Sequence, residues 1–66
     1  MNIADRIQHL RKARGLSQEE LADAVGVSRQ AVSKWESGAS DPSTANLIAL
    51  AKLFGTTPEE LLKESQ

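Results

Sequence analysis

The sequence predicts an all-α protein, a compact bundle of five helices formed by a single domain that spans residues 1–66. At 66 residues the chain has room for only a small core, and helices, whose contacts are local, are the elements most easily packed into one. The chain contains no cysteine, so neither a disulfide nor a thiolate metal site can add stability. Four glycines separate segments in which apolar residues recur at helical spacing.

The first helix is predicted to run from a cap at Asn2 to about Arg14, where Gly15 ends it. Its inward stripe recurs at i, i+4 and i+7 and consists of Ile3, Ile7 and Leu10. Arg11 lies beside this stripe, so its aliphatic stem can cover the core while the guanidinium reaches an acid. We expect that acid to be Glu36, although the spacing alone equally allows two separately solvated charges.

The second helix is predicted to begin after Ser17 and to end at Gly26. Ser17 and Glu20 have the spacing of a capping box, in which each side chain accepts a hydrogen bond from the other residue's amide. Gly26 can adopt the left-handed conformation that ends a helix within one residue. The inward positions of this helix are Leu21, Ala22 and Val25.

A third helix is predicted over residues 29–36, with Ser28 as its N-cap. Steps of about 100° per residue place Ala31, Val32 and Trp35 on one side. Trp35 is therefore expected in the core and not as a base-stacking residue. The other side carries only Arg29, Gln30, Ser33 and Lys34, and Gln and Arg can bond base edges bidentately in the major groove. Two helices joined by a short glycine-containing turn, the second with such a face, are the pattern of a DNA-binding helix-turn-helix.

Two more helices are predicted over residues 44–54 and 58–62. The first follows Pro42 and an N-cap at Ser43, and Gly55 ends it. The second begins with a cap at Thr57 and Pro58 at its first position. Helix 44–54 is apolar almost all round, as expected for a helix in the middle of a small bundle, and its broad arc comprises Leu47, Ile48, Leu50, Ala51 and Phe54.

These segments together resemble the lambda-repressor-like, Cro-like (XRE) helix-turn-helix domains over nearly the whole chain. The matching parts are LSQEELA at 16–22, GVSRQAVSKWESG at 26–38, Pro42, LIALAKLFG at 47–55 and TPEELL at 57–62. The resemblance implies a five-helix lambda-repressor-like fold. It also implies a sequence-specific transcriptional regulator that binds double-stranded DNA and represses by occupying an operator.

The predicted base contacts are Arg29, Gln30, Ser33 and Lys34, with Ala31 beside a thymine methyl group. The predicted contacts to the DNA backbone are Gln18, Ser28, Ser37, Gly38, Ala39 and Ser40. Hydroxyls and amides are expected to hold phosphates after residue 38, because the chain has Ala39, Ser40 and Asp41 where many relatives carry Lys or Arg. The resemblance further implies that Gln18 braces the first residues of helix 29–36, and that Arg11 and Glu36 form a partly buried pair that locks this helix to the first.

Two leucines predict a homodimer. Leu53 lies about 120° from the centre of its helix's apolar arc, and Leu62 directly follows Leu61, so one of that adjacent pair must face away from the interior. An apolar patch of Leu53 and Leu62 would mark a partner surface, and related repressors dimerise through this end. Such a dimer would place two helices 29–36 about 34 Å apart, matching half-sites of a palindromic operator. The alternative is that both leucines only pack the last helix onto the fourth.

The net charge of −1 and the pI of 5.7 argue mildly against nucleic acid. The charges are unevenly distributed, however, with Arg6, Arg11, Lys12, Arg14, Arg29 and Lys34 before residue 35 and Asp41, Glu59, Glu60 and Glu64 after it. The low net charge keeps an alternative open, a protein-interaction module of the same fold such as an antitoxin or adaptor.

Other classes of protein are not expected. The sequence offers no nucleophile–base pair, phosphate-binding glycine loop or paired catalytic carboxylates, so we expect neither an enzyme nor a cofactor, metal ion or small-molecule ligand. No apolar run approaches the roughly 18 residues that cross a bilayer, so we expect a cytoplasmic protein without a membrane partner.

Overall fold

The computed structural model describes residues 2–63, which form five helices. They are α1 Ile3–Ala13, α2 Gln18–Val25, α3 Arg29–Ser37, α4 Thr44–Phe54 and α5 Pro58–Leu62. The predicted all-α class and the five predicted helices are confirmed. Two ends differ by one residue, since α1 stops before Arg14 and α3 continues to Ser37. None of these helices has the length and apolar content needed to cross a membrane.

Every helix begins at a side chain that satisfies a free amide of its first turn. In each case the capping oxygen accepts a hydrogen bond from the backbone N–H three residues later, which is the N-cap geometry that the sequence predicts. The five caps are Asn2, Ser17, Ser28, Ser43 and Thr57.

The turn between α2 and α3 depends on Gly26. Its φ of +88° is left-handed, and its amide and that of Val27 both donate to the Ala22 carbonyl, at 2.8 and 2.9 Å. A Cβ at Gly26 would meet no atom within 4 Å, so the requirement for glycine is conformational and not steric. The chain reverses within this turn and α3 packs directly against α2.

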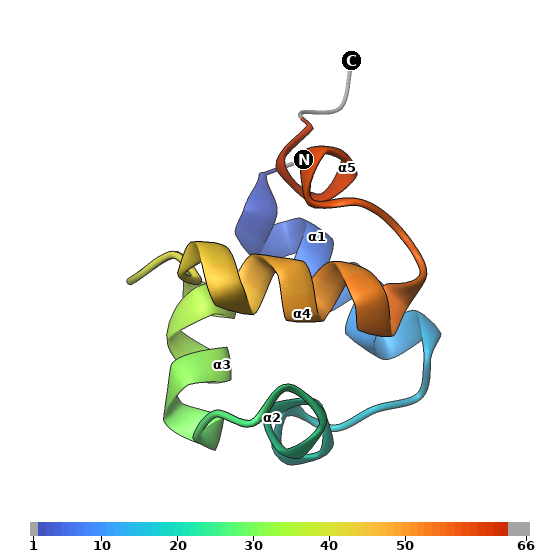
Figure 1. Cartoon of the computed structure of the whole chain (residues 1–66). Helices are drawn as coiled ribbons and strands as arrows, with labels where there is room; N and C mark the ends of the chain where they lie inside the picture. The colour runs from blue at the N-terminus through green and yellow to red at the C-terminus, as the bar shows by residue number, and fades with distance from the viewer. Residues whose placement is uncertain (1, 64–66) are drawn as a thin grey trace.

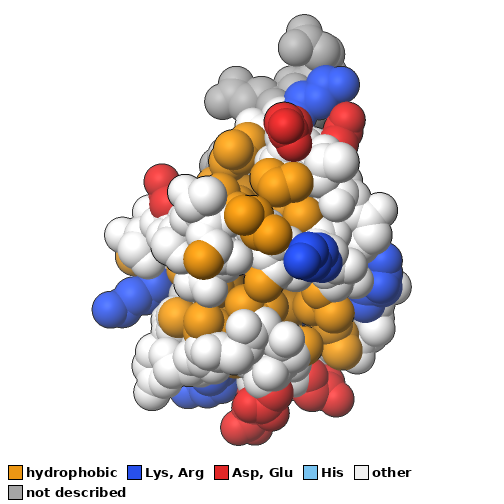
Figure 2. All heavy atoms as spheres, in the orientation of Figure 1, with side chains coloured by type: hydrophobic (Ala, Val, Ile, Leu, Met, Phe, Trp, Pro, Cys, Tyr) orange, Lys and Arg blue, Asp and Glu red, His pale blue; other side chains and the backbone are white. Residues whose placement is uncertain are grey.

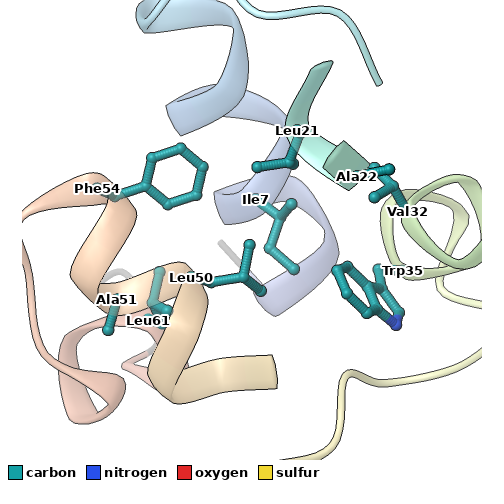
Figure 3. Packing of buried hydrophobic residues seen from close by; sticks show 9 residues of the cluster. All are labelled: Ile7, Leu21, Ala22, Val32, Trp35, Leu50, Ala51, Phe54 and Leu61. Atoms are coloured by element: carbon teal, nitrogen blue, oxygen red, sulfur yellow. The ribbon is translucent and has the colours of Figure 1, made fainter. Parts of the chain in front are cut away.

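The helices surround one core to which all five contribute (Figure 1). α4 lies across the front of the view, with α2 below it, α3 to one side and α1 behind. α1 packs against α3 and α5, while α4 packs against α2 and α5. The core, shown in Figure 3, consists of Ile7, Leu21, Ala22, Val32, Trp35, Leu50, Ala51, Phe54 and Leu61.

Ile48 departs from the sequence prediction. It was expected in the inward arc of α4, but it is 43% exposed, whereas Leu50, Ala51 and Phe54 are buried. α4 is apolar nearly all round, so its sequence does not define the edges of the buried face. The packing of the other helices against α4 defines them instead, and Ile48 lies outside the fully buried part of that face.

Candidate nucleic-acid interface

The outward face of α3 is polar and held from within by two buried side chains. Val32 is fully buried and Trp35 is only 4% exposed, so both fasten α3 to the core. On the opposite side Arg29, Gln30 and Lys34 are exposed, and Ser33 is half-buried beside them. Trp35 belongs to the core cluster, as predicted, and is not available to stack on a base. α3 therefore presents hydrogen-bonding and cationic groups from a fixed position.

A charged pair fixes the end of α3. Arg11 donates from Nε to Glu36 Oε2 at 2.7 Å and from Nη2 to Glu36 Oε1 at 3.1 Å. Its third nitrogen, Nη1, donates to the Leu16 carbonyl at 2.8 Å. The two side chains are only 12% and 3% exposed, so the pair is bidentate and largely removed from water. Arg11 thereby joins α1, the loop before α2 and the last turn of α3.

Gln18 completes this network, but at a different place from the one expected. Its Nε2 donates to Glu36 Oε1 at 3.1 Å, so it braces the last turn of α3 and not the first residues. Glu36 thus accepts three hydrogen bonds, two from Arg11 and one from Gln18. The amide nitrogen of Gln18 has a second hydrogen, which can donate to a phosphate while the first stays on Glu36.

The N-terminus of α2 carries the predicted capping box. The Ser17 amide donates to Glu20 Oε1 at 2.8 Å, and the Glu20 amide donates to Ser17 Oγ at 3.0 Å. Hydrogen bonding of the Glu20 carboxylate, first to the Ser17 backbone amide and then to the Ser17 hydroxyl, lowers the pKa of Glu20 below its ordinary value. A negative charge therefore stays beside the N-terminus of α2, where the helix dipole favours it.

The loop after α3 directs its hydrogen bonds inward. The amides of Ala39 and Ser40 donate to the Lys34 carbonyl at 3.0 and 3.3 Å, and the amide of Gly38 donates to the last turn of α3 as well. The Ser37 hydroxyl also donates to Lys34 O, at 3.1 Å. These groups close the C-terminus of α3, where the helix itself leaves carbonyls unsatisfied. Phosphate contacts by Ser37, Gly38, Ala39 and Ser40 stay a prediction, and the inward hydrogen bonding of their amides and of the Ser37 hydroxyl is a physical reason against it.

The hydroxyl of Ser28 differs from that of Ser37. Ser28 is exposed, and its Oγ accepts from the Ala31 amide at 3.2 Å. A hydroxyl that accepts in this way keeps its hydrogen for another partner. Ser28 and the exposed Ser40 are thus better placed to donate to phosphates than Ser37.

Two of the cations in the basic first half of the sequence, Arg6 and Arg14, donate hydrogen bonds to the C-terminal ends of α5 and α4. Arg6 donates from Nη1 to the Glu60 carbonyl at 2.9 Å and from Nη2 to the Lys63 carbonyl at 3.0 Å. Arg14 donates from Nη1 to Leu53 O at 3.2 Å and from Nη2 to Phe54 O at 2.8 Å. Backbone carbonyls have no sequence signature, so charge counting could not reveal these partners.

The structure does not bring Leu53 and Leu62 together as one exposed patch. Leu62 is 56% exposed, but Leu53 is half-buried and packs against the core. Ala51 lies beside Leu61 where α4 and α5 meet (Figure 3). At about 100° per residue, Ile48 is about 60° from Ala51 around α4, whereas Leu53 is about 160° from it.

Ile48 therefore lies on the flank of α4 that faces α5, and Leu53 lies on the other flank. Ile48 and Leu62 are the two exposed large hydrophobic residues of the described chain. Figure 2 shows hydrophobic side chains gathered between α4 and α5 on this face of the molecule. We call Ile48 and Leu62 the α4–α5 patch. A helical wheel of α4 centred on Ala51 would have placed Ile48, and not Leu53, on the same side as α5.

Comparison with known proteins gives one consistent match. The family described as helix-turn-helix matches residues 7–61. The HTH-type transcriptional activator BcrR of Enterococcus faecalis is 44% identical over 62 residues, covering 94% of this chain and 30% of BcrR. Repressor protein C2 of Salmonella phage P22 is 39% identical over 61 residues, covering 92% of this chain and 28% of C2.

A solved structure is similarly close. The P22 c2 repressor, in complex with a synthetic operator, superposes with a TM-score of 0.92 at 37% identity, and the match covers 98% of each chain. The present chain spans less than a third of the full length of both relatives, BcrR and C2.

Proposed function

The chain belongs to the helix-turn-helix family, with lambda-repressor-like (XRE) relatives, and on that premise we propose that it is a sequence-specific transcriptional regulator. It binds double-stranded DNA in the cytoplasm and acts by occupying an operator, not by chemistry. The observation that carries this proposal is the outward face of α3, where Arg29, Gln30 and Lys34 are exposed while Val32 and Trp35 fix the helix from within. The likeness to the P22 repressor in complex with its operator supports placing α3 in the major groove.

The base contacts are Arg29, Gln30 and Lys34, with the half-buried Ser33 beside them. Selection of bound DNA from a random-sequence pool tests them, with the parent chain compared with Gln30→Ala. Each good base contact contributes about 1–3 kcal/mol of discrimination, so the preferred bases should change at defined positions. Gln8→Ala, the same chemical change on α1, should leave the preference unaltered. Equal weakening of all sequences by Gln30→Ala would instead mean that Gln30 contacts the DNA backbone.

The phosphate contacts are proposed to be largely uncharged. Gln18, Ser28 and Ser40 supply neutral donors, and neutral donors release few counterions. We therefore expect a shallow dependence of affinity on salt, with a log–log slope of about 0.9 for each phosphate neutralised by Lys or Arg. Fluorescence anisotropy measures this slope when the affinity for the selected duplex is determined at several salt concentrations between about 50 and 200 mM.

The salt titration and the selection from the duplex pool together distinguish DNA binding from the alternative, a protein-interaction module. A steep slope would contradict the uncharged phosphate contacts. Failure to bind any duplex in the pool would favour a protein-interaction module of the same fold, for which the net charge of −1 is the supporting observation.

We propose that two copies associate through the α4–α5 patch when they bind a palindromic operator. Leu62 is more than half exposed on a small domain, and an apolar side chain of this size on a remote surface favours a partner. A two-fold axis there would set two α3 helices about one DNA turn apart. Leu62→Glu should abolish association in sedimentation equilibrium, whereas Ala24→Glu, an exposed site on α2, should not. An association state unchanged by Leu62→Glu would remove this interface.

A further inference from the structure

We propose that Arg6 is a positioning residue for the association surface on α5. Its guanidinium binds the backbone on both sides of Leu62 and so sets the direction in which Leu62 is presented to a second copy of the chain. This inference rests on the proposed association through the α4–α5 patch. It assigns to α1 a part in that association that the sequence does not reveal, since Arg6 and Leu62 are far apart along the chain.

The geometry of the contact is a fork over the end of α5. Nη1 donates to Glu60 O at 2.9 Å, and Nη2 donates to Lys63 O at 3.0 Å. These two carbonyls bracket Leu61 and Leu62 at the helix end, where few backbone donors remain, and Glu60 O also accepts from the Lys63 amide at 3.4 Å. Because the guanidinium is planar and its two nitrogens are fixed relative to each other, the fork sets the orientation of the helix end as well as its distance from α1.

α5 has few other means of holding this end. It has only five residues, Pro58–Leu62, and helices of that length are not stable by themselves in water. Its other anchors are the Thr57 hydroxyl, which accepts from the Glu60 amide at 3.2 Å, and the buried side chain of Leu61. Both act at or before Leu61, and the backbone hydrogen bond beyond it, from the Lys63 amide to Glu60 O, is long at 3.4 Å. Leu62 itself is 56% exposed and contributes little packing, so its direction depends on Arg6.

Arg14, which directly follows the last residue of α1, offers a matched control. It makes the same kind of fork at the end of α4, to Leu53 O at 3.2 Å and to Phe54 O at 2.8 Å. α4, however, has eleven residues and buries Leu50, Ala51 and Phe54, so packing alone keeps it in place. Loss of the Arg14 fork should lower stability without redirecting the α4–α5 patch.

The experiment compares Arg6→Lys with Arg14→Lys in the full chain by sedimentation equilibrium. Lysine keeps the positive charge but has one nitrogen and cannot form the fork. We expect Arg6→Lys to raise the dimer dissociation constant about tenfold, which is the factor expected if each of the two copies presents Leu62 in the binding direction only about a third of the time. Arg14→Lys should leave it within about twofold. Affinity for a DNA duplex with a single half-site should be the same for both variants, because one copy binds it without a partner.

A second measurement follows α5 directly and does not depend on association. Amide hydrogen exchange is compared in the Leu62→Glu background, with and without Arg6→Lys. The amides of residues 61, 62 and 63 should exchange at least several-fold faster when the fork is lost, while the Leu50 amide in α4 should not change. Equal protection in both proteins would overturn the role of Arg6, even if Arg6→Lys weakened association through general destabilisation.

The outcomes separate this inference from the proposed interface. If the parent chain associates and Leu62→Glu prevents it, but Arg6→Lys leaves the dissociation constant unchanged, the interface stands and the role of Arg6 is wrong. If the parent chain remains monomeric with and without operator DNA, the interface fails and the positioning role fails with it. An equal loss of association in Arg6→Lys and Arg14→Lys would also overturn it, because a merely structural effect would then suffice.

Discussion

Two arginines of α1, only five residues apart, hold the two functional ends of the molecule by different chemistry. Arg11 fixes α3 through a carboxylate, and both side chains of that pair are nearly removed from water. Arg6 fixes α5 through two carbonyls at the exposed surface. A residue separation of five places the two side chains about 140° apart around α1, so one helix serves both ends.

The difference lies in what remains when either contact is broken. Loss of one member of the Arg11–Glu36 pair leaves a charge partly buried without its partner, which is strongly unfavourable. Loss of Arg6 leaves carbonyls that water can reach. α3, the helix proposed to face DNA, is therefore locked by a buried pair, whereas α5 is held by contacts that water can replace.

The largest effect is expected from removing half of the locked pair. Glu36→Ala should lower the free energy of unfolding by about 3 kcal/mol, because Arg11 and Gln18 both lose their acceptor while remaining partly buried. The double variant Arg11→Met, Glu36→Ala should be less destabilised than the sum of the single variants. Urea denaturation of the four proteins completes the double-mutant cycle. Additive effects would mean that the pair is not coupled, and the contrast with Arg6 would then disappear.

An intermediate effect is expected at the carbonyl contacts of α4. Arg14→Met removes two charge-assisted hydrogen bonds and the contact of the guanidinium with the Phe54 ring, whose centroid is 5.9 Å away. Because the group is largely exposed, the loss should be only about 1 kcal/mol in thermal unfolding. Lys12→Met, an exposed site on the same helix, controls for the change in charge. A loss as large as that of Glu36→Ala would show that exposed carbonyl contacts lock a helix as firmly as the buried pair.

A smaller effect is expected from Gln18, which contributes one hydrogen bond to Glu36 of the Arg11–Glu36 pair. Gln18→Ala should lower stability by about 0.5–1 kcal/mol, since Glu36 retains both bonds from Arg11. DNA affinity should fall more than stability does, because the same amide group is proposed to contact a phosphate. Unfolding and anisotropy measured on the same variant separate the two effects. A fall in stability with full DNA affinity would confine Gln18 to a structural role.

Local signals in this sequence were sufficient to predict the fold. The contacts between residues far apart along the chain could not be predicted from them. The caps at Ser17 and Thr57 and the left-handed Gly26 are fixed by neighbouring residues, so periodicity and turn chemistry predict them. The partners of Arg6 and Arg14 are backbone carbonyls more than thirty residues away, and every residue has such a carbonyl.

In the candidate site, too, the features set by neighbouring residues were predicted, and those set by hydrogen bonds to other parts of the backbone were not. The outward face of α3 follows from its own helical period. The amides of Gly38 and Ala39 were expected to hold phosphates, and the sequence does not show that both donate to carbonyls in the last turn of α3. Ile48 was assigned to the wrong face because α4 is apolar on nearly every side.

The smallest effect concerns Glu20, on the DNA-facing side but outside the locked pair. Its pKa is lowered in the folded chain by the Ser17 amide and hydroxyl, so the ionised form stabilises the fold. This contribution is fully present above the ordinary glutamate pKa of about 4.3 and is lost as the pH falls through the lower folded value. The carboxylate is fully exposed, so the change should be slight. Glu20→Gln keeps the capping geometry without the charge, and its stability between pH 7 and pH 3, about the range that spans this titration, should fall less than that of the parent. If both proteins lost stability in parallel, the acid sensitivity would arise at groups other than Glu20.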